Sequence, residues 1–170
     1  MESRSSVGEY SDTQLLFQKA SCRCHRFRDE CRVQNVFVED CDYAGYCKRG
    51  IYVKTNPDRG GFVRNIHVHN CIFDEVEDLF YVTSMYAGEG QNSTHYSEIS
   101  DIVVDGLRCR KVRQAALVLQ GTEARHVKNV VFRNIEVGEC KNGVSFEHAD
   151  NVLMSDCIIG GKAGVPTQIK

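Results

Sequence analysis

A nine-residue phrase in which apolar and polar positions alternate recurs along the chain. Its clearest copies are VQNVFVEDC from Val33 and VRNIHVHNC from Val63, and weaker copies begin at Ile99, Val127 and Ala149. Alternation with a period of two residues is typical of a strand with one buried face. The third position of every copy is Asn or Asp, at intervals of 30, 36, 28 and 22 residues. Repeats of this length that contain strands predict a solenoid.

A second strand is predicted after the phrase in each of the first four units. These segments are GIYVKT from Gly50, DLFYVTS from Asp78, QAALVLQG from Gln114 and NGVSFEHA from Asn142, each separated from its phrase by a short polar stretch. Nothing between them has helical periodicity or a helix-capping pattern. The sequence therefore predicts an all-β parallel β-helix of about five coils. A β-sandwich is the alternative, but its strands would not share one repeated phrase.

The repeats divide the chain into three parts. Residues 33–160 form the predicted coils, residues 161–170 a C-terminal tail, and residues 1–32, which lack the phrase, an irregular N-terminal segment or cap. The first residues, MESRSSVGEYSDTQ, contain no apolar stretch like that of a signal peptide, so the localisation stays open. The alternative is that the natural N-terminus is missing. Open ends of a solenoid promote association, so we expect self-association unless residues 1–32 cover the first coil.

Two positions of the phrase are expected to stack from coil to coil. The ninth position holds small or medium apolar side chains: Cys41, Cys71, Leu107, Ile135 and Cys157. A free cysteine behaves as a small hydrophobe, so these residues are predicted to form an interior row. The Asn and Asp residues at the third position are expected to satisfy turn backbone groups and to stack on one another.

Composition excludes several classes of protein. The chain has 170 residues, 21 Lys and Arg against 23 Asp and Glu, and 42% hydrophobic residues. This balance argues against disorder and against a strongly charged binder of nucleic acid or lipid. No apolar run approaches the roughly 18 residues of a membrane-spanning helix. The sequence has no basic stripe with interleaved aromatic residues, which is the pattern typical of proteins that bind nucleic acid.

The nine cysteines suggest reduced thiols rather than a disulfide framework, because no secretory signal accompanies them. Cys22, Cys24 and His25, with Cys31 and His67, are the candidates for a zinc site. Their C-x-C spacing matches the paired ligands of zinc sites poorly, so no metal or cofactor is predicted. His67 and His69 alternate with inward residues and are expected at the surface.

The string GIYVKTNPDRGG, residues 50–61, carries the candidate binding residues. If Ile51 and Val53 point inward, then Tyr52 and Lys54 project together from the outer face of the strand. A lysine held on a rigid strand can pair with a substrate carboxylate. The alternative is that Lys54 is an ordinary solvated strand residue.

The string GIYVKTNPDRGGFVRNIHVHNC, followed by ISDIVVDGL and VKNVVFRNI, resembles the C-terminal half of glycoside hydrolase family 28, the polygalacturonases and related pectinases. The resemblance implies a right-handed parallel β-helix and hydrolysis of galacturonan with inversion. It assigns a substrate-binding role to Lys54, which matches the lysine of the family's Arg-Ile-Lys motif. Tyr52 stands in place of that motif's arginine, and Tyr86 corresponds to a substrate-stacking tyrosine. The resemblance implies galacturonan as the partner; the alternative is that the chain has no partner.

The chain departs from the family at its catalytic motifs, since it contains no Asn-Thr-Asp, Asp-Asp or Gly-His-Gly sequence. Glu147 is predicted on the same outer row as Lys54, but three strand spacings of about 4.8 Å separate them by roughly 14 Å. Asp58 and Asp74 are expected in turns without partners. No catalytic residue is therefore assigned, and the chain is expected to be a truncated, inactive module. The alternative is a non-catalytic carbohydrate-binding or structural β-solenoid.

Overall fold

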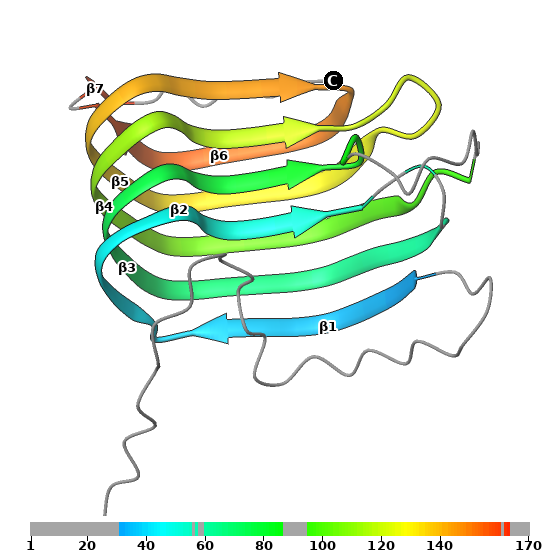
Figure 1. The fold of residues 1–170 in the computed structure, drawn as a ribbon, viewed down its shortest axis with the longest axis horizontal. Coiled ribbons are helices and arrows are strands. Elements are labelled where there is room, and N and C mark those ends of the chain that lie inside the picture. Colours follow the sequence, from blue (N-terminus) through cyan, green and yellow to red (C-terminus); the bar gives the residue numbers. More distant parts are fainter. Residues whose placement is uncertain (1–30, 56, 58–59, 87–94, 161, 164–170) are drawn as a thin grey trace, which may run out of the picture.

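The chain folds as a stack of parallel strands. The computed structural model describes residues 31–55, 57, 60–86, 95–160 and 162–163. All regular structure in these ranges is β-strand, and the chain winds in successive turns that lie on one another (Figure 1). The strands are β1 (Cys31–Glu39), β2 (Asp42–Lys54), β3 (Gly61–Thr83), β4 (Glu98–Gln120), β5 (Val127–Glu147), β6 (Ala149–Ile159) and β7 (Lys162–Ala163).

Each turn of the chain pairs with the next turn. The strand order is β1-β3-β4-β5-β6-β7, β2 also pairs with β3, and every pairing except that of β6 with β7 is parallel. β1 and β2 make the first turn, β3, β4 and β5 make one turn each, and β6 begins another. The predicted all-β parallel β-helix of about five coils is therefore confirmed.

The predicted division of each coil into two strands is wrong for three coils. β3, β4 and β5 are continuous strands of 23, 23 and 21 residues. Each of these strands bends at a residue with positive φ: Asn70 in β3, Gly106 in β4 and Asn134 in β5. A single left-handed residue turns the chain and the parallel ladder resumes at once. The pairing register also shifts once along each of two strands, between Val76 and Phe80 in β3 and between Val112 and Ala115 in β4.

Side-chain hydrogen bonds join the third-position residues of the first two coils and those of the last three, so the predicted stacking is seen within each group. All five adopt left-handed backbone conformations, with φ between 53° and 58°: Asn35, Asn65, Asp101, Asn129 and Asn151. Asn65 donates to Asn35 at 2.5 Å, Asn129 donates to Asp101 at 2.8 Å, and Asn151 donates to Asn129 at 2.9 Å. Asn and Asp tolerate positive φ better than other residues with side chains, so one residue type serves both the turn and the stack.

The predicted ninth-position row lies in the core. Cys71 is aligned with Leu107, Leu107 with Ile135, and Ile135 with Cys157, and each is at most 3% exposed. Burial raises the pKa of the Cys71 thiol to about 11. Cys41, in the first coil, is the exception because it is exposed. Six described cysteines form no disulfide: Cys41, Cys47, Cys71, Cys109, Cys140 and Cys157.

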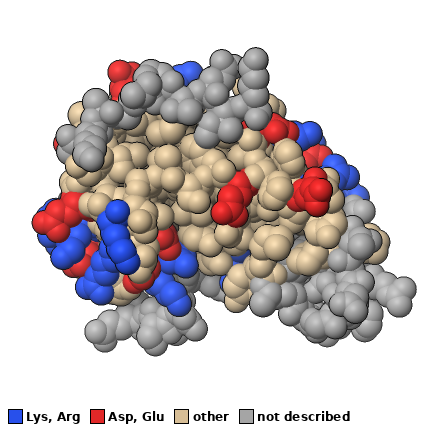
Figure 2. Space-filling view, turned by 90° about the horizontal axis from the view of Figure 1, so that it is seen from above, with Lys and Arg blue, Asp and Glu red and all other residues tan. Residues whose placement is uncertain are grey.

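The C-terminal end of the stack is open along β5. β6 pairs with β5 only as far as Val137, so residues 139–147 have a neighbouring strand on one side within the described part. Val144 is consequently 47% exposed, although alternation predicts it to point inward. Figure 2 shows this end as a largely uncharged face that also carries acidic side chains near its middle, with Lys and Arg gathered at its edges. Self-association through open ends remains a prediction.

Two predicted segments lie largely outside the described residues. Residues 1–30 are not described, so the N-terminal segment or cap stays a prediction. The short strand β7 falls within the predicted C-terminal tail. Over the ranges that the structure describes, no helix is long and apolar enough to cross a membrane.

Candidate functional site

Tyr52 and Lys54 lie on the outer face of β2, as alternation predicts. Ile51 and Val53 are 1% and 5% exposed and point into the core. Lys54 is exposed and Tyr52 is half-buried. The core row therefore fixes the direction in which the lysine projects.

Tyr86 lies beside Lys54. The Lys54 ammonium is 4.2 Å from the centre of the Tyr86 ring and 5.7 Å from that of Tyr52. The backbone N–H of Thr55 donates to the Thr83 carbonyl at 2.9 Å, and that of Tyr86 donates to the Thr55 carbonyl at 3.2 Å. These bonds bring the residues after β3 next to the end of β2. The structure thus gathers all three predicted substrate-binding residues, while their role toward a substrate stays a prediction.

Thr55 adds a polar atom next to Lys54. Its hydroxyl oxygen is buried and has no hydrogen-bond partner among the residues that the structure describes. Buried hydroxyl groups are usually paired, so this oxygen is unusual, but its burial keeps it from direct contact with a ligand in this structure. Sequence reasoning did not single out Thr55, because a threonine after a strand is common.

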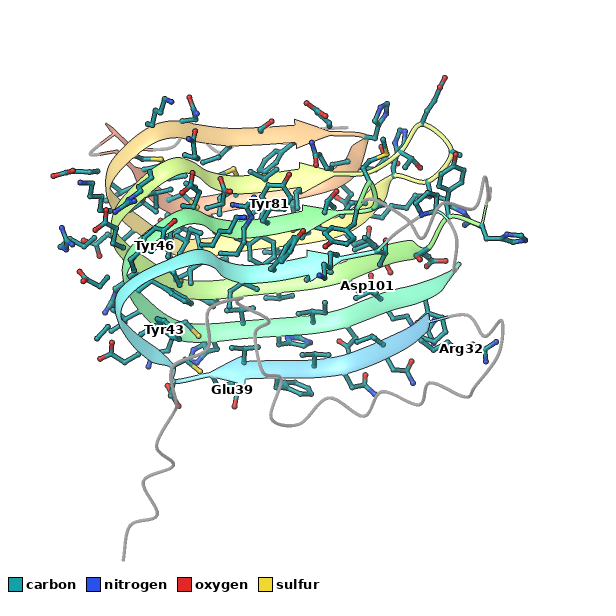
Figure 3. The ribbon with its side chains drawn as sticks, in the orientation of Figure 1. Arg32, Glu39, Tyr43, Tyr46, Tyr81 and Asp101 are labelled. Carbon is teal, nitrogen blue, oxygen red and sulfur yellow. The ribbon has the colours of Figure 1, made fainter. Side chains whose placement is uncertain are left out.

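Two tyrosines and an arginine extend the site along the wall. The Tyr52 and Tyr81 rings meet edge to face, with centres 5.6 Å apart. The Arg49 guanidinium carbon lies 4.6 Å from the centre of the Tyr81 ring and 5.8 Å from that of Tyr52. The Tyr81 hydroxyl donates to the Gln120 side chain at 3.0 Å. Figure 3 shows the side chains of this wall with Tyr81 labelled. Sequence reasoning missed Arg49, because strict alternation with Ile51 and Val53 assigns it to the interior.

Asp78 is the buried partner of Arg49. The two residues are aligned on β2 and β3 and form an ion pair in which the Asp78 side chain is 7% exposed. The other carboxylate oxygen of Asp78 accepts the backbone N–H of Ala115 on β4 at 3.0 Å. Burial raises the pKa of Asp78, and these two partners oppose that effect. Sequence reasoning missed Asp78 because the register between coils cannot be read from one strand.

Carboxylates do not approach one another on the Lys54 row. The register aligns Lys54 with Thr83, Thr83 with Gln120, and Gln120 with Glu147, so Glu147 occupies the predicted row. Three strand spacings place it roughly 14 Å from the lysine. An inverting pair needs a separation of about 6.5–9.5 Å with both acids beside the same bond. The row therefore supplies a single carboxylate, distant from Lys54.

Asp74 differs from its prediction, and Asp58 lies outside the described residues. Asp74 lies within β3, not in an unpartnered turn, and Arg110 of β4 donates to it at 2.6 Å. The Arg110 guanidinium holds the pKa of Asp74 below its usual range. Asp74 is thus part of a charged pair between coils, because neighbouring turns place oppositely charged side chains side by side.

The histidines contact neighbouring coils. The His67 ring stacks on Phe37, with centres 5.1 Å apart, and shares a 2.8 Å hydrogen bond with the Asn65 side chain. His67 is half-buried and His69 is exposed. No group of three or more His, Cys, Asp or Glu side chains among the described residues is arranged to hold a metal ion. Cys22, Cys24 and His25 lie outside those residues.

Comparison with known families decides the relationship. The model of glycosyl hydrolases family 28 matches residues 25–162. The chain belongs to this family. The match includes the string around Lys54 and all the phrases of the repeat, so the resemblance inferred from the sequence is confirmed. No curated protein matches the chain. Family 28 membership makes this chain a glycoside hydrolase family module, and its own residues must indicate what it does.

Proposed function

We propose that this family 28 module binds galacturonan through Lys54 and the tyrosines around it, and that it does not hydrolyse the polymer. The observation that carries the proposal is the Lys54 ammonium 4.2 Å from the Tyr86 ring and 5.7 Å from the Tyr52 ring. Within the described residues, no carboxylate forms an ion pair with this lysine. Its charge is therefore available to a carboxylate on the ligand.

The chemistry of the neighbours suits an acidic sugar. A lysine is a compact point charge that attracts a uronate carboxylate. Tyrosine rings offer flat apolar faces with a polar tip, which fits the mixed surface of a sugar ring. An ion pair alone at an exposed site would contribute little, so the rings are needed for affinity.

The absence of hydrolysis follows from the carboxylates. The sequence has no Asn-Thr-Asp or Asp-Asp motif, and Glu147 is three strands from Lys54 on its row. Loss of one positioned acid or base typically lowers the rate by about 10²–10⁴-fold. A site that lacks both members of the pair should leave only the binding part of the family's function.

The test is titration calorimetry of the full chain with oligogalacturonate, alongside release of reducing sugar from polygalacturonate. We expect measurable binding without release of reducing sugar. Lys54→Ala should remove most of the binding heat. Arg110→Ala is the matched control, because Arg110 is a cation already paired with Asp74, and this variant should bind like the wild type.

Each outcome bears on the proposal. Sugar release that Lys54→Ala abolishes would show an active enzyme and contradict the second half of the proposal. Absence of binding by the wild type would contradict the first half and favour a purely structural β-solenoid. Equal loss of binding in both variants would show that general positive charge, rather than the Lys54 site, attracts the polymer.

A further inference from the structure

Arg49 and Asp78, with side-chain exposures of 21% and 7%, form the one ion pair of the described residues that touches the aromatic wall of the proposed site. The carboxylate of Asp78 links three successive coils, since it belongs to β3, pairs with Arg49 of β2 and accepts from Ala115 of β4. Ion pairs at the bend, such as Arg110 with Asp74, are far more exposed, with side-chain exposures of 60% and 42%. The burial of the Arg49–Asp78 pair therefore requires a reason beyond surface charge balance.

Burying an ion pair costs free energy unless each member also makes its remaining hydrogen bonds. Asp78 uses one oxygen for the guanidinium and the other for the Ala115 N–H, which lies where the β4 register shifts. Such irregularities leave a backbone donor without a ladder partner, and the carboxylate supplies one. Asp78 is thus held from two sides, and it in turn fixes the position of the guanidinium.

The guanidinium lies against Tyr52, one of the two rings beside Lys54, and against the neighbouring Tyr81 ring. It is 4.6 Å from the centre of Tyr81 and 5.8 Å from that of Tyr52, whose rings also contact each other. A planar cation over an aromatic ring is attractive and restricts the ring. The Tyr52 ring so restricted is the same ring that faces the Lys54 ammonium.

We propose that Asp78 is a positioning residue that, through Arg49, orders Tyr52 and Tyr81 as one wall of the uronate site. The inference rests on the proposed function for its consequence in binding, but the ordering of the rings does not require a ligand. A wall that is ordered before binding avoids the entropic cost of immobilising the tyrosines when the sugar arrives. The affinity of the site therefore depends on a carboxylate that does not touch the sugar.

The first variant is Asp78→Asn in the full chain. The amide oxygen can still accept from Ala115, whereas the amide group cannot form an ion pair with Arg49. We expect the NMR signals of the labelled Tyr52 and Tyr81 rings to move toward those of mobile tyrosine, with or without ligand. Titration with oligogalacturonate should show affinity reduced by about threefold to tenfold, the size expected for a lost cation–π arrangement. Asp74→Asn, which breaks the Asp74–Arg110 pair at the bend, should change neither the ring signals nor the affinity for oligogalacturonate.

A second variant keeps the test decisive if Asp78→Asn does not fold. Arg49→Lys retains a cation beside Asp78 but lacks the planar guanidinium, so the ring signals should shift while the fold persists. Wild-type ring signals in both variants would overturn the proposal, as would unchanged affinity in Asp78→Asn when Lys54→Ala does lose binding. If the wild type binds no oligogalacturonate, the proposed function fails, and the ring signals alone still decide whether Asp78 orders the wall.

Discussion

Two rows of aligned side chains run along this stack, and they differ in kind. The first row holds Asn or Asp in every coil, and side-chain hydrogen bonds join the first two of these residues and the last three. The second row holds Lys54, Thr83, Gln120 and Glu147, four different chemistries in four coils. Side chains of the repeating row form hydrogen bonds with one another. In the varying row, the Lys54 ammonium contacts aromatic rings and forms no ion pair with a described carboxylate. In this solenoid, the repeating row holds coils together, and the varying row carries the proposed ligand site.

The largest effect is expected in the repeating row. Asn129→Ala should lower the free energy of unfolding by about 2–3 kcal/mol, because it places alanine at a positive φ and removes the bonds to Asp101 and from Asn151. Chemical denaturation would measure this loss. Binding of oligogalacturonate at 25 °C should be unchanged, since the two rows are separate.

Asn129→Gly separates the two causes. Glycine accepts the left-handed conformation without strain, so this variant should lose only the hydrogen-bonding part, about 1 kcal/mol. A glycine variant as unstable as the alanine variant would show that backbone strain contributes nothing at this position. A change of affinity for oligogalacturonate in either variant would show that the repeating row also affects ligand binding.

A smaller effect is expected from the ring next to Lys54. Tyr86→Ala should weaken oligogalacturonate binding by about threefold to tenfold while leaving stability nearly unchanged, because Tyr86 is 45% exposed. Tyr46 is the matched control, since its ring lies 4.3 Å from the Arg113 guanidinium near the bend of the coils. Tyr46→Ala should leave the calorimetric affinity as it is. Equal losses in the two variants would mean that any cation–ring pair on this protein contributes equally to binding.

The smallest effect is a dependence of stability on pH in the repeating row. Hydrogen bonds from Asn129 and Ser100 lower the pKa of Asp101 in the folded chain. The unfolded chain then binds more protons, so the contribution of Asp101 is complete above the ordinary carboxyl pKa of about 3.9 and is lost as pH falls through the lowered value. Asp101→Asn, which still tolerates positive φ, should cost about 0.5 kcal/mol near neutral pH.

Denaturation curves of both chains at several pH values would measure this difference. The two stabilities should converge as the pH is lowered below about 3.9. A gap that stays constant or widens toward acid would show that the Asp101 carboxylate is not favoured by the fold.

The sequence predicts the repeating features better than the singular ones. The phrase marks the third-position ladder and the buried ninth-position row because the same residue types return in every coil. The continuous course of β3, β4 and β5 was not predictable in the same way, because a polar stretch reads as a break between strands. In the structure a single left-handed residue, such as Asn70, bends the strand without ending it.

The site was predicted only in part for a related reason. Alternation along one strand shows that Tyr52 and Lys54 face outward, but it does not show which residues of other coils come next to them. Arg49 and Asp78 are 29 residues apart in the chain, and Lys54 and Tyr86 are 32 residues apart. Both contacts therefore depend on how neighbouring coils are aligned and connected. Those contacts require the coordinates of the neighbouring coils.

The unequal spacing of the repeats has a practical consequence. The third-position residues are 30, 36, 28 and 22 residues apart, yet the ladders stay aligned, so the extra length lies in the connections between strands. Those connections follow Lys54, Thr83, Gln120 and Glu147, all members of the varying row. A peptide grafted into the connection from Thr83 to Glu98 would therefore change the surface beside the lysine without disturbing the stack. The scaffold is suited to engineering in which recognition is altered by insertion and the framework is left intact.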